Sequence, residues 1–219
     1  MNKRTQHITA GRAALLALTL AALSAPAAAQ DWVVKVGAVR YDTSSKTTGI
    51  KGIGVPPGAD AETGDATTAI FVIERTLTPN IGAELVLGIP PRIKARATGT
   101  VAFLGDNVLS AKNVAPTVLV NYYFGEPGAT WRPYLGVGIN YTRFASAKSS
   151  LAPDVELSDS VGAVVQAGVN YAVDKRWGLF GSIARVDVKS DLVAVGSTVL
   201  TTTIDFRPVT YSLGVWYRF

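Results

Sequence analysis

Few residues in this chain could carry out chemistry, and their distribution excludes most kinds of it. The 219 residues contain no Cys and one His, His7, which lies in an N-terminal segment with the features of a leader. Beyond that segment there is no imidazole and no thiol, so His-dependent catalysis and His or Cys metal sites are excluded. Ser or Thr with Lys could still supply a nucleophile, but no spacing suggests one. The sequence therefore predicts neither an enzyme nor a metal or cofactor site.

Three charged residues, Lys35, Glu74 and Glu84, lie within segments rich in apolar residues. If these segments are membrane strands, the charges must face inward, because Arg or Lys facing lipid at the midplane costs roughly 2 to 4 kcal/mol. Buried charges need partners. We therefore predict that Lys35 pairs with Glu74 or Glu84 inside the protein, as a structural plug and not a binding site.

The N-terminal segment accounts for most of the net charge of +5. Residues 1–29 have a basic start, an apolar run from Ala13 to Leu23 and small residues to Ala29, which predicts a secretory signal cleaved after Ala29. The alternative is an N-terminal membrane anchor, although the apolar run is shorter than the roughly 20 residues that span a bilayer. The remaining charges form no basic stripe along the sequence, so a nucleic-acid partner is not expected.

From residue 30 onward the apolar residues alternate with polar or small ones. Leu135, Val137 and Ile139 share one parity, and Gly136 and Gly138 share the other. This period of two predicts strands with two unlike faces. We expect eight strands, at residues 32–42, 67–77, 81–91, 114–124, 131–144, 159–173, 177–188 and 204–219.

The connections between these strands alternate in length. Short turns at 78–80, 125–130 and 174–176 alternate with long polar loops at 43–66, 92–113, 145–158 and 189–203. This arrangement predicts one all-β domain over residues 30–219, an antiparallel up-and-down β-barrel. Several strands have 11 or more residues, and about 9 to 11 suffice to cross a bilayer at a tilt.

Alternation alone also fits a soluble, lipocalin-like barrel with the apolar face inside. Aromatic residues at the short-turn ends favour a membrane barrel, because such rings prefer the height of lipid headgroups. The expected girdle comprises Trp32, Tyr122, Tyr123, Phe124, Trp131, Tyr171, Trp177, Tyr217 and Phe219. The last strand, with apolar residues at alternate places up to Phe219, resembles the signal that the barrel-insertion machinery of Gram-negative bacteria recognises.

Several segments together resemble the OmpW/AlkL family of outer-membrane proteins. They are residues 80–85, 96–99, 122–125, 131–142 and 159–171 and the ending Tyr217-Arg218-Phe219. The resemblance covers nearly all of the chain after the leader. It implies an eight-stranded barrel in the Gram-negative outer membrane, with an apolar lumen that passes small hydrophobic compounds and releases them sideways into the bilayer.

The residues themselves allow such a lumen. Val86, Leu119, Phe180 and Ala184, interleaved with Gly88, Gly136 and Gly138, are expected to line an apolar cavity open to the long loops. The alternative is a merely well-packed interior. In some members of the family that this chain resembles, a bulky Leu and a Trp narrow the lumen, and the corresponding positions here are Val86 and Ala184. Both are smaller, so if they face inward we expect the constriction of the lumen to be wider or placed elsewhere.

Three prolines are expected at similar height on neighbouring strands. Pro90 and Pro91 end the third strand and Pro116 begins the fourth, and each lacks a ladder donor. We expect a lateral gap there, with simple fraying into the loop as the alternative.

The competing function is a non-conducting structural or interaction protein of the OmpA or OmpX kind. Expected partners are outer-membrane lipid, small hydrophobic ligands and the insertion machinery; the oligomeric state is left open.

Overall fold

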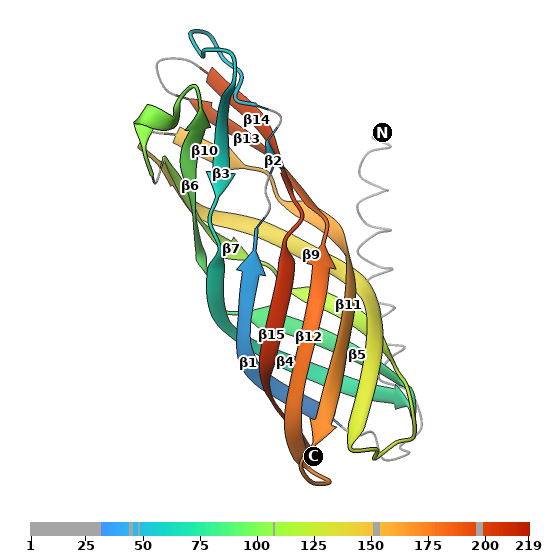
Figure 1. Cartoon of the computed structure of the whole chain (residues 1–219). Helices are drawn as coiled ribbons and strands as arrows, with labels where there is room; N and C mark the ends of the chain where they lie inside the picture. The colour runs from blue at the N-terminus through green and yellow to red at the C-terminus, as the bar shows by residue number, and fades with distance from the viewer. Residues whose placement is uncertain (1–31, 44–45, 48, 107, 151–153, 196–198) are drawn as a thin grey trace, which may run out of the picture. The chain divides into compact units, whose positions relative to one another are not determined.

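The computed structural model describes residues 32–43, 46–47, 49–106, 108–150, 154–195 and 199–219 (Figure 1). Most of them lie in strands. The strands of the barrel wall are β1 (Trp32–Asp42), β4 (Ala66–Thr78), β5 (Ile81–Gly88), β8 (Thr117–Tyr123), β9 (Trp131–Ser149), β11 (Ser160–Ala172), β12 (Trp177–Val186) and β15 (Val209–Arg218). The predicted leader lies outside the described residues and stays a prediction. Among the described residues, no helix has the length and apolar character needed to cross a bilayer.

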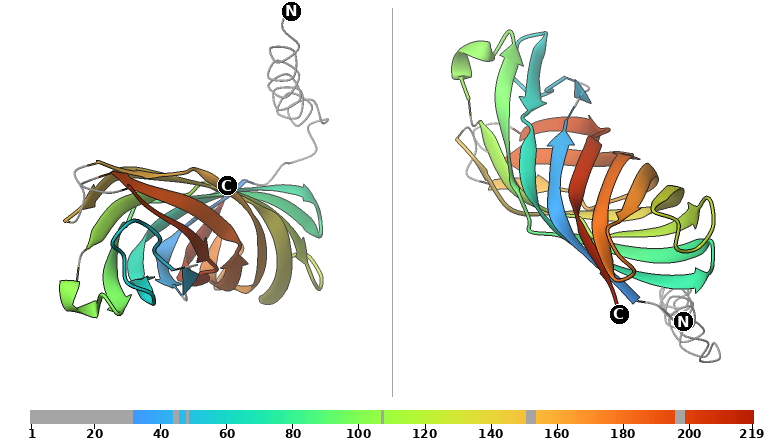
Figure 2. Two further views of the ribbon diagram at one scale, coloured as in Figure 1. Left: turned by 90° about the horizontal axis from the view of Figure 1, so that it is seen from above. Right: turned by 60° about the horizontal axis from the view of Figure 1, so that its bottom comes forward.

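These eight strands form a closed antiparallel barrel. The order is β11-β12-β15-β1-β4-β5-β8-β9, and pairing of β9 with β11 closes the sheet. Two further views show the sheet curving round on itself (Figure 2). The first and last strands meet where Val33 pairs with Arg218 and the Phe219 N–H donates to the Trp32 carbonyl at 3.0 Å. The predicted eight-stranded barrel is confirmed.

The segments predicted as long polar loops contain further strands, so their assignment as loops is wrong for much of their length. Strands continue into them as β2 (Lys46–Thr47), β3 (Ala59–Thr63), β6 (Arg92–Gly99), β7 (Leu109–Val114), β10 (Asp154–Leu157), β13 (Val188–Val195) and β14 (Val199–Phe206), with one 3-10 turn, η1 (Ala102–Leu104). β7, β6 and β3 extend the sheet beyond β9, and β10, β13, β14 and β2 form a second sheet. Residues 92–97 alternate charged and apolar side chains, which also suits strands above the membrane.

Prolines explain the differences in strand bounds. β5 ends at Gly88, before Pro90, and β8 begins after Pro116. The expected last strand, 204–219, is two strands that are interrupted before Val209 by Pro208. Proline has no N–H to give to the ladder, so regular pairing stops at these positions.

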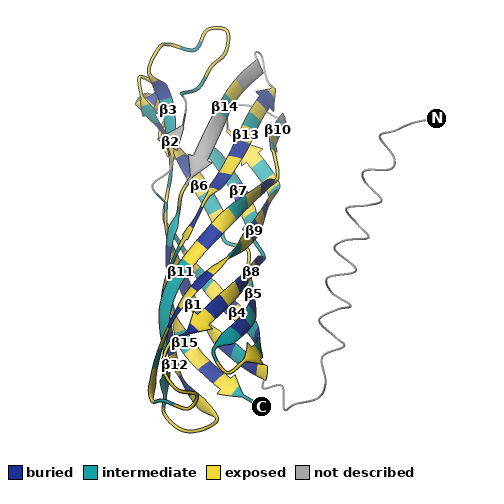
Figure 3. Ribbon diagram, turned by 90° about the vertical axis from the view of Figure 1, so that its right-hand side faces the viewer, coloured by how far each residue is buried: buried dark blue, intermediate teal, exposed yellow. Residues whose placement is uncertain are grey.

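The apolar side chains of the alternating pattern point out of the barrel. Buried and exposed residues alternate along the wall strands in Figure 3. Leu135, Val137 and Ile139 are exposed at 55–63%, whereas Asn121 and Asn140 are buried. An exposed apolar belt around an interior that holds the buried polar side chains differs from the polar outer face of a water-soluble barrel, and it matches a wall that faces lipid.

The aromatic girdle forms with one exception. Seven of the nine predicted residues are exposed, and the Tyr171 ring packs at a tilt against Trp131 with ring centroids 4.7 Å apart. Tyr123 is buried and points into the barrel. Its assignment to the girdle was wrong because neighbouring residues of a strand face opposite sides, so Tyr122 and Tyr123 cannot both face lipid.

Candidate functional site

A cluster of buried charges crosses the lumen near the short-turn end. Glu74 of β4 and Glu84 of β5 are direct cross-strand partners, and Lys35 of β1 lies beside them. Lys35 Nζ is 2.8 Å from Glu74 Oε2 and 3.7 Å from Glu84 Oε1. Two carboxylates placed opposite each other repel, so the fully buried ammonium group compensates a cost that the β4–β5 register imposes.

Polar side chains from other strands complete this cluster. The Asn121 amide N–H donates to Glu84 Oε2, and Gln166 Nε2 donates to the same oxygen at 3.1 Å and to Asn121 Oδ1 at 2.9 Å. The Tyr123 hydroxyl donates to Glu74 Oε2 at 2.6 Å. We call Lys35, Glu74, Glu84, Asn121, Tyr123 and Gln166 the plug. Alternation along β8 could have revealed Tyr123, because it shares the parity of Asn121.

Aromatic rings and glycines fit closely around the plug. Lys35 Nζ lies 5.3 Å from the centre of the Tyr134 ring and 5.7 Å from that of Phe180. A Cβ at Gly136 would overlap Asn121 Oδ1, so the space that this glycine leaves is filled by the plug. Gly136 therefore admits the polar side chains and does not open the cavity, contrary to expectation.

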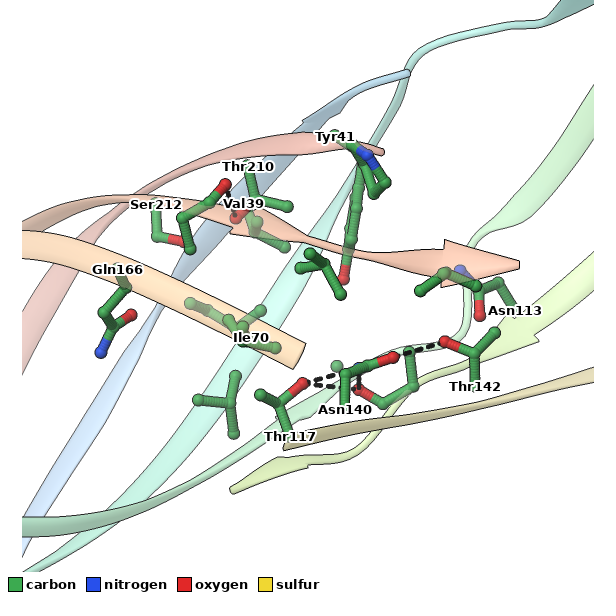
Figure 4. Close-up of a pocket in the computed structure, with 18 of the residues that line it drawn as sticks. Val39, Tyr41, Ile70, Asn113, Thr117, Asn140, Thr142, Gln166, Thr210 and Ser212 are labelled. Carbon is green, nitrogen blue, oxygen red and sulfur yellow. Dashed lines mark hydrogen bonds between the residues drawn. The ribbon is translucent and has the colours of Figure 1, made fainter. Parts of the chain in front are cut away.

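A cavity of about 100 Å³ lies on the loop side of the plug (Figure 4). The predicted residues Val86, Leu119, Phe180 and Ala184 all line it, and Glu84 and Gln166 contribute to its lining as well. Further apolar lining residues are Val39, Ile70, Val72, Ile93, Phe144, Val164, Val186 and Val188. Gly88 also faces this space: a Cβ there would have no neighbour nearer than 3.8 Å.

One side of the cavity is polar, which the sequence analysis did not anticipate. Asn140 Nδ2 donates to Thr117 Oγ1 at 2.7 Å, and the Thr142 hydroxyl donates to Asn140 Oδ1 at 2.6 Å (Figure 4). The same amide group lies 3.3 Å and 3.4 Å from the carbonyl oxygens of Ala115 and Pro116. Asn140 therefore ties the beginning of β8 to β9.

A second cavity, of about 540 Å³, lies at the short-turn end. Glu74, Tyr123, Arg132 and Arg218 are among the residues that line it. Glu84 lines the loop-side cavity and Glu74 lines this one, although the two residues pair directly across β4 and β5. The plug thus lies between the two cavities.

The predicted gap residues lie where the wall pairing changes. The β5–β8 ladder runs from the Ile81–Tyr122 pair to the Val86–Thr117 pair. Hydrogen bonding across the wall resumes where the Asn113 N–H donates to the Pro91 carbonyl at 3.0 Å. No ladder pair is recorded between these two points, and every residue there is described. Pro90 and Pro116 fall within this interruption, and Pro91 stands at its far edge.

No group of three or more His, Cys, Asp or Glu side chains that could hold a metal ion occurs in the part of the chain that the structure describes. The plug has two carboxylates, and one ammonium group already lies beside both of them. Its chemistry is ion pairing and hydrogen bonding between buried groups.

Comparison with known proteins assigns the barrel to a family. The model of the OmpW family matches residues 28–219. The chain belongs to the OmpW family. It is 32% identical over 151 residues to outer membrane protein W of Escherichia coli K12, which covers 65% of this chain and 68% of that protein. Outer membrane protein AlkL of Ectopseudomonas oleovorans is 27% identical over 169 residues, 77% of this chain and 73% of that protein.

The crystal structure of the outer membrane protein OprG from Pseudomonas aeruginosa has the same fold, with a TM-score of 0.80 and 23% identity over 87% of this chain and 96% of that one. The OmpW family assignment and these neighbours make the chain a barrel of the outer membrane, in contact with its lipid. The family gives it a transport or structural role and not an enzymatic one.

Proposed function

We propose that this OmpW-family barrel admits small hydrophobic molecules from the loop side and releases them sideways into the outer membrane. The observation that carries the proposal is the position of the loop-side cavity. It lies above the plug, and residues from both sides of the interrupted wall, Gly88 and Ala115, line it. A ligand held there would be next to the stretch of wall where β5 and β8 form no ladder pairs.

The plug favours this sideways route over an axial one. An apolar molecule that crossed Lys35, Glu74 and Glu84 would have to separate buried ions without replacing their interactions, and breaking a buried ion pair costs about 3 to 5 kcal/mol. Burial in the apolar part of the cavity is favourable by about 25 cal/mol per Å² of apolar surface, and so is transfer into acyl chains.

Asn140 supports the same route by keeping one edge of the gap in place. Its amide group lies against two carbonyls and a hydroxyl at residues 115–117, so this edge is bonded to β9 even though β5 does not pair with it. The other edge, residues 87–89, is bonded to β4, so each edge of the gap is held by its own neighbouring strand and opening requires the two edges to move apart.

The proposal also covers the processing of the chain and its insertion into the membrane. Residues 1–29 are the cleaved secretion signal, residues 30–219 are the barrel domain, and the last strand with Phe219 is the signal for the insertion machinery. β15 offers this machinery alternate exposed residues, among them Leu213 and Val215.

The test measures uptake of naphthalene by Gram-negative cells with and without the gene. In the gene-bearing cells, G88C/A115C links the two edges of the gap, and S182C/S212C links a directly paired position of β12 and β15 that also lines the cavity. The native chain has no Cys, so no other disulfide can form within the chain. We expect uptake to fall with the first link, to recover on reduction and to be unaffected by the second.

Equal uptake with and without the gene would instead favour a non-conducting structural or interaction protein. Loss of uptake with both links would indicate that a blocked cavity, and not a closed gap, is responsible, and would contradict sideways release.

A further inference from the structure

We propose that the outer wall of β6, β7 and β9 binds the phosphate groups of a lipid in the outer leaflet. Five exposed cations lie on this stretch of wall, above the apolar belt. We call them the cationic patch: Arg92, Lys94, Lys112, Arg143 and Lys148.

The strand register brings these cations together. Arg92 of β6 is the direct partner of Lys112 of β7, and Lys94 and Lys148 flank Ser110 from the two sides. Arg143 pairs with Val114, two residues from Lys112. Like charges directly opposite each other destabilise a sheet, and residues on this diagonal are still neighbours. An anion bound between the two cations would offset this repulsion.

Nearby carboxylates already have other partners. Glu62, next to the patch on β3, forms an ion pair with Arg96 at 2.6 Å. Asp159, near Arg143, accepts a hydrogen bond from the Tyr141 hydroxyl at 2.5 Å. Within the described residues, none of the five cations has a carboxylate oxygen within 4.0 Å. Lys94 shares a surface pocket with Glu62, Asp65 and Asp106, but Asp65 pairs with Arg40 at 2.9 Å and Asp106 lies near Arg96. The five cations are therefore not held in ion pairs and can meet an external anion.

The position of the patch favours a lipid over a soluble anion. Along the outer face of β9, exposed Val137 and Ile139 are followed by Tyr141 and then by Arg143. Arg143 is four residues from Ile139, about 13 Å along the strand. A lipid whose acyl chains lie on the belt would hold its headgroup at this height. Clusters of Lys and Arg beside a membrane bind anionic headgroups, and Arg suits phosphate geometry.

The test uses the folded barrel in zwitterionic detergent, with diphosphoryl lipid A and its dephosphorylated form as the two probes. R92Q/K112Q removes the opposed pair. Each cation near an anionic surface contributes about fivefold to binding, so we expect about 25-fold weaker affinity for diphosphoryl lipid A. The control K175Q/R176Q removes the same charge at the short-turn end and should leave this affinity unchanged. Affinity for the dephosphorylated lipid should be low for all three proteins.

A second measurement separates binding from a structural effect. In detergent without anionic lipid, R92Q/K112Q should raise the unfolding temperature, because it removes like-charge repulsion. With diphosphoryl lipid A the native barrel should gain more stability than the variant. Equal affinity of the native barrel for both lipids, or unchanged affinity of the variant, would overturn the proposal. So would tighter binding of dextran sulfate than of lipid A at the patch, because the ligand would then be a soluble polyanion.

Discussion

The plug and the loop-side cavity use inward positions of the same strands, a few residues apart, and yet one is filled and the other is open. In the plug, long polar side chains point toward glycines, so that Asn121 and Gln166 occupy the space beside Gly136. In the cavity, shorter apolar side chains such as Val86 and Ala184 meet the open space beside Gly88. The difference shows that a glycine in a barrel interior opens space only where no long side chain faces it.

The largest effect on stability should come from removing the cation of the plug. Lys35→Met leaves Glu74 and Glu84 buried and opposed, which should lower the free energy of unfolding by about 3 to 5 kcal/mol. The temperature at which the barrel loses its folded mobility on gels would fall accordingly. The triple variant K35M/E74Q/E84Q, which is neutral, should recover most of the loss. A Lys35→Met barrel as stable as the native one would show that the ion pairs hold nothing together.

An intermediate effect on stability is expected when a glycine is replaced by alanine, once in the plug region and once beside the cavity. Gly136→Ala places a Cβ against Asn121 and Gln166, and such overpacking costs typically about 1 to 3 kcal/mol. Gly88→Ala meets only ordinary contacts from 3.8 Å outward, and it should be neutral or stabilising by up to about 1 kcal/mol. Thermal unfolding of the two variants in one detergent compares them. Equal losses would contradict the contrast between a filled and an open region.

The smallest effect on stability should come from filling the cavity, although uptake should respond clearly. Ala184→Phe projects a ring into about 100 Å³ of space and should reduce naphthalene uptake severalfold. Ile183→Phe is the matched control, because Ile183 is the adjacent, outward-facing residue of β12. Unchanged uptake in Ala184→Phe cells would indicate that ligands do not pass through this cavity.

Much of the wall could be predicted from the sequence, because apolar residues at every second position indicate which face of each strand meets lipid. Alternation placed the eight wall strands and put Asn121, Asn140 and Gln166 inside. Strict use of the same rule would have placed Tyr123 inside as well. The strands beyond the belt were missed because polar alternating segments such as β6 look like loops when judged by composition.

The interactions within the site were less accessible, because they depend on register. Lys35 and Glu84 are far apart in sequence, and only the order β1-β4-β5 brings them to one height. The choice between Glu74 and Glu84, the contacts of Asn140 and the gathering of Arg92, Lys112 and Arg143 all required cross-strand pairing. A single sequence does not specify this pairing to one residue.

The meeting of β1 and β15 has a consequence for how the molecule is made. The two ends of the polypeptide are neighbours in the finished cylinder, joined over ten residue pairs from Val33–Arg218 to Asp42–Val209. Until these two strands pair, the unfinished sheet has two free edges whose backbone amides lack hydrogen-bond partners, and the hydrocarbon core of the bilayer supplies none. Assembly must therefore wait for the final segment, and half a cylinder is not a stable stopping point.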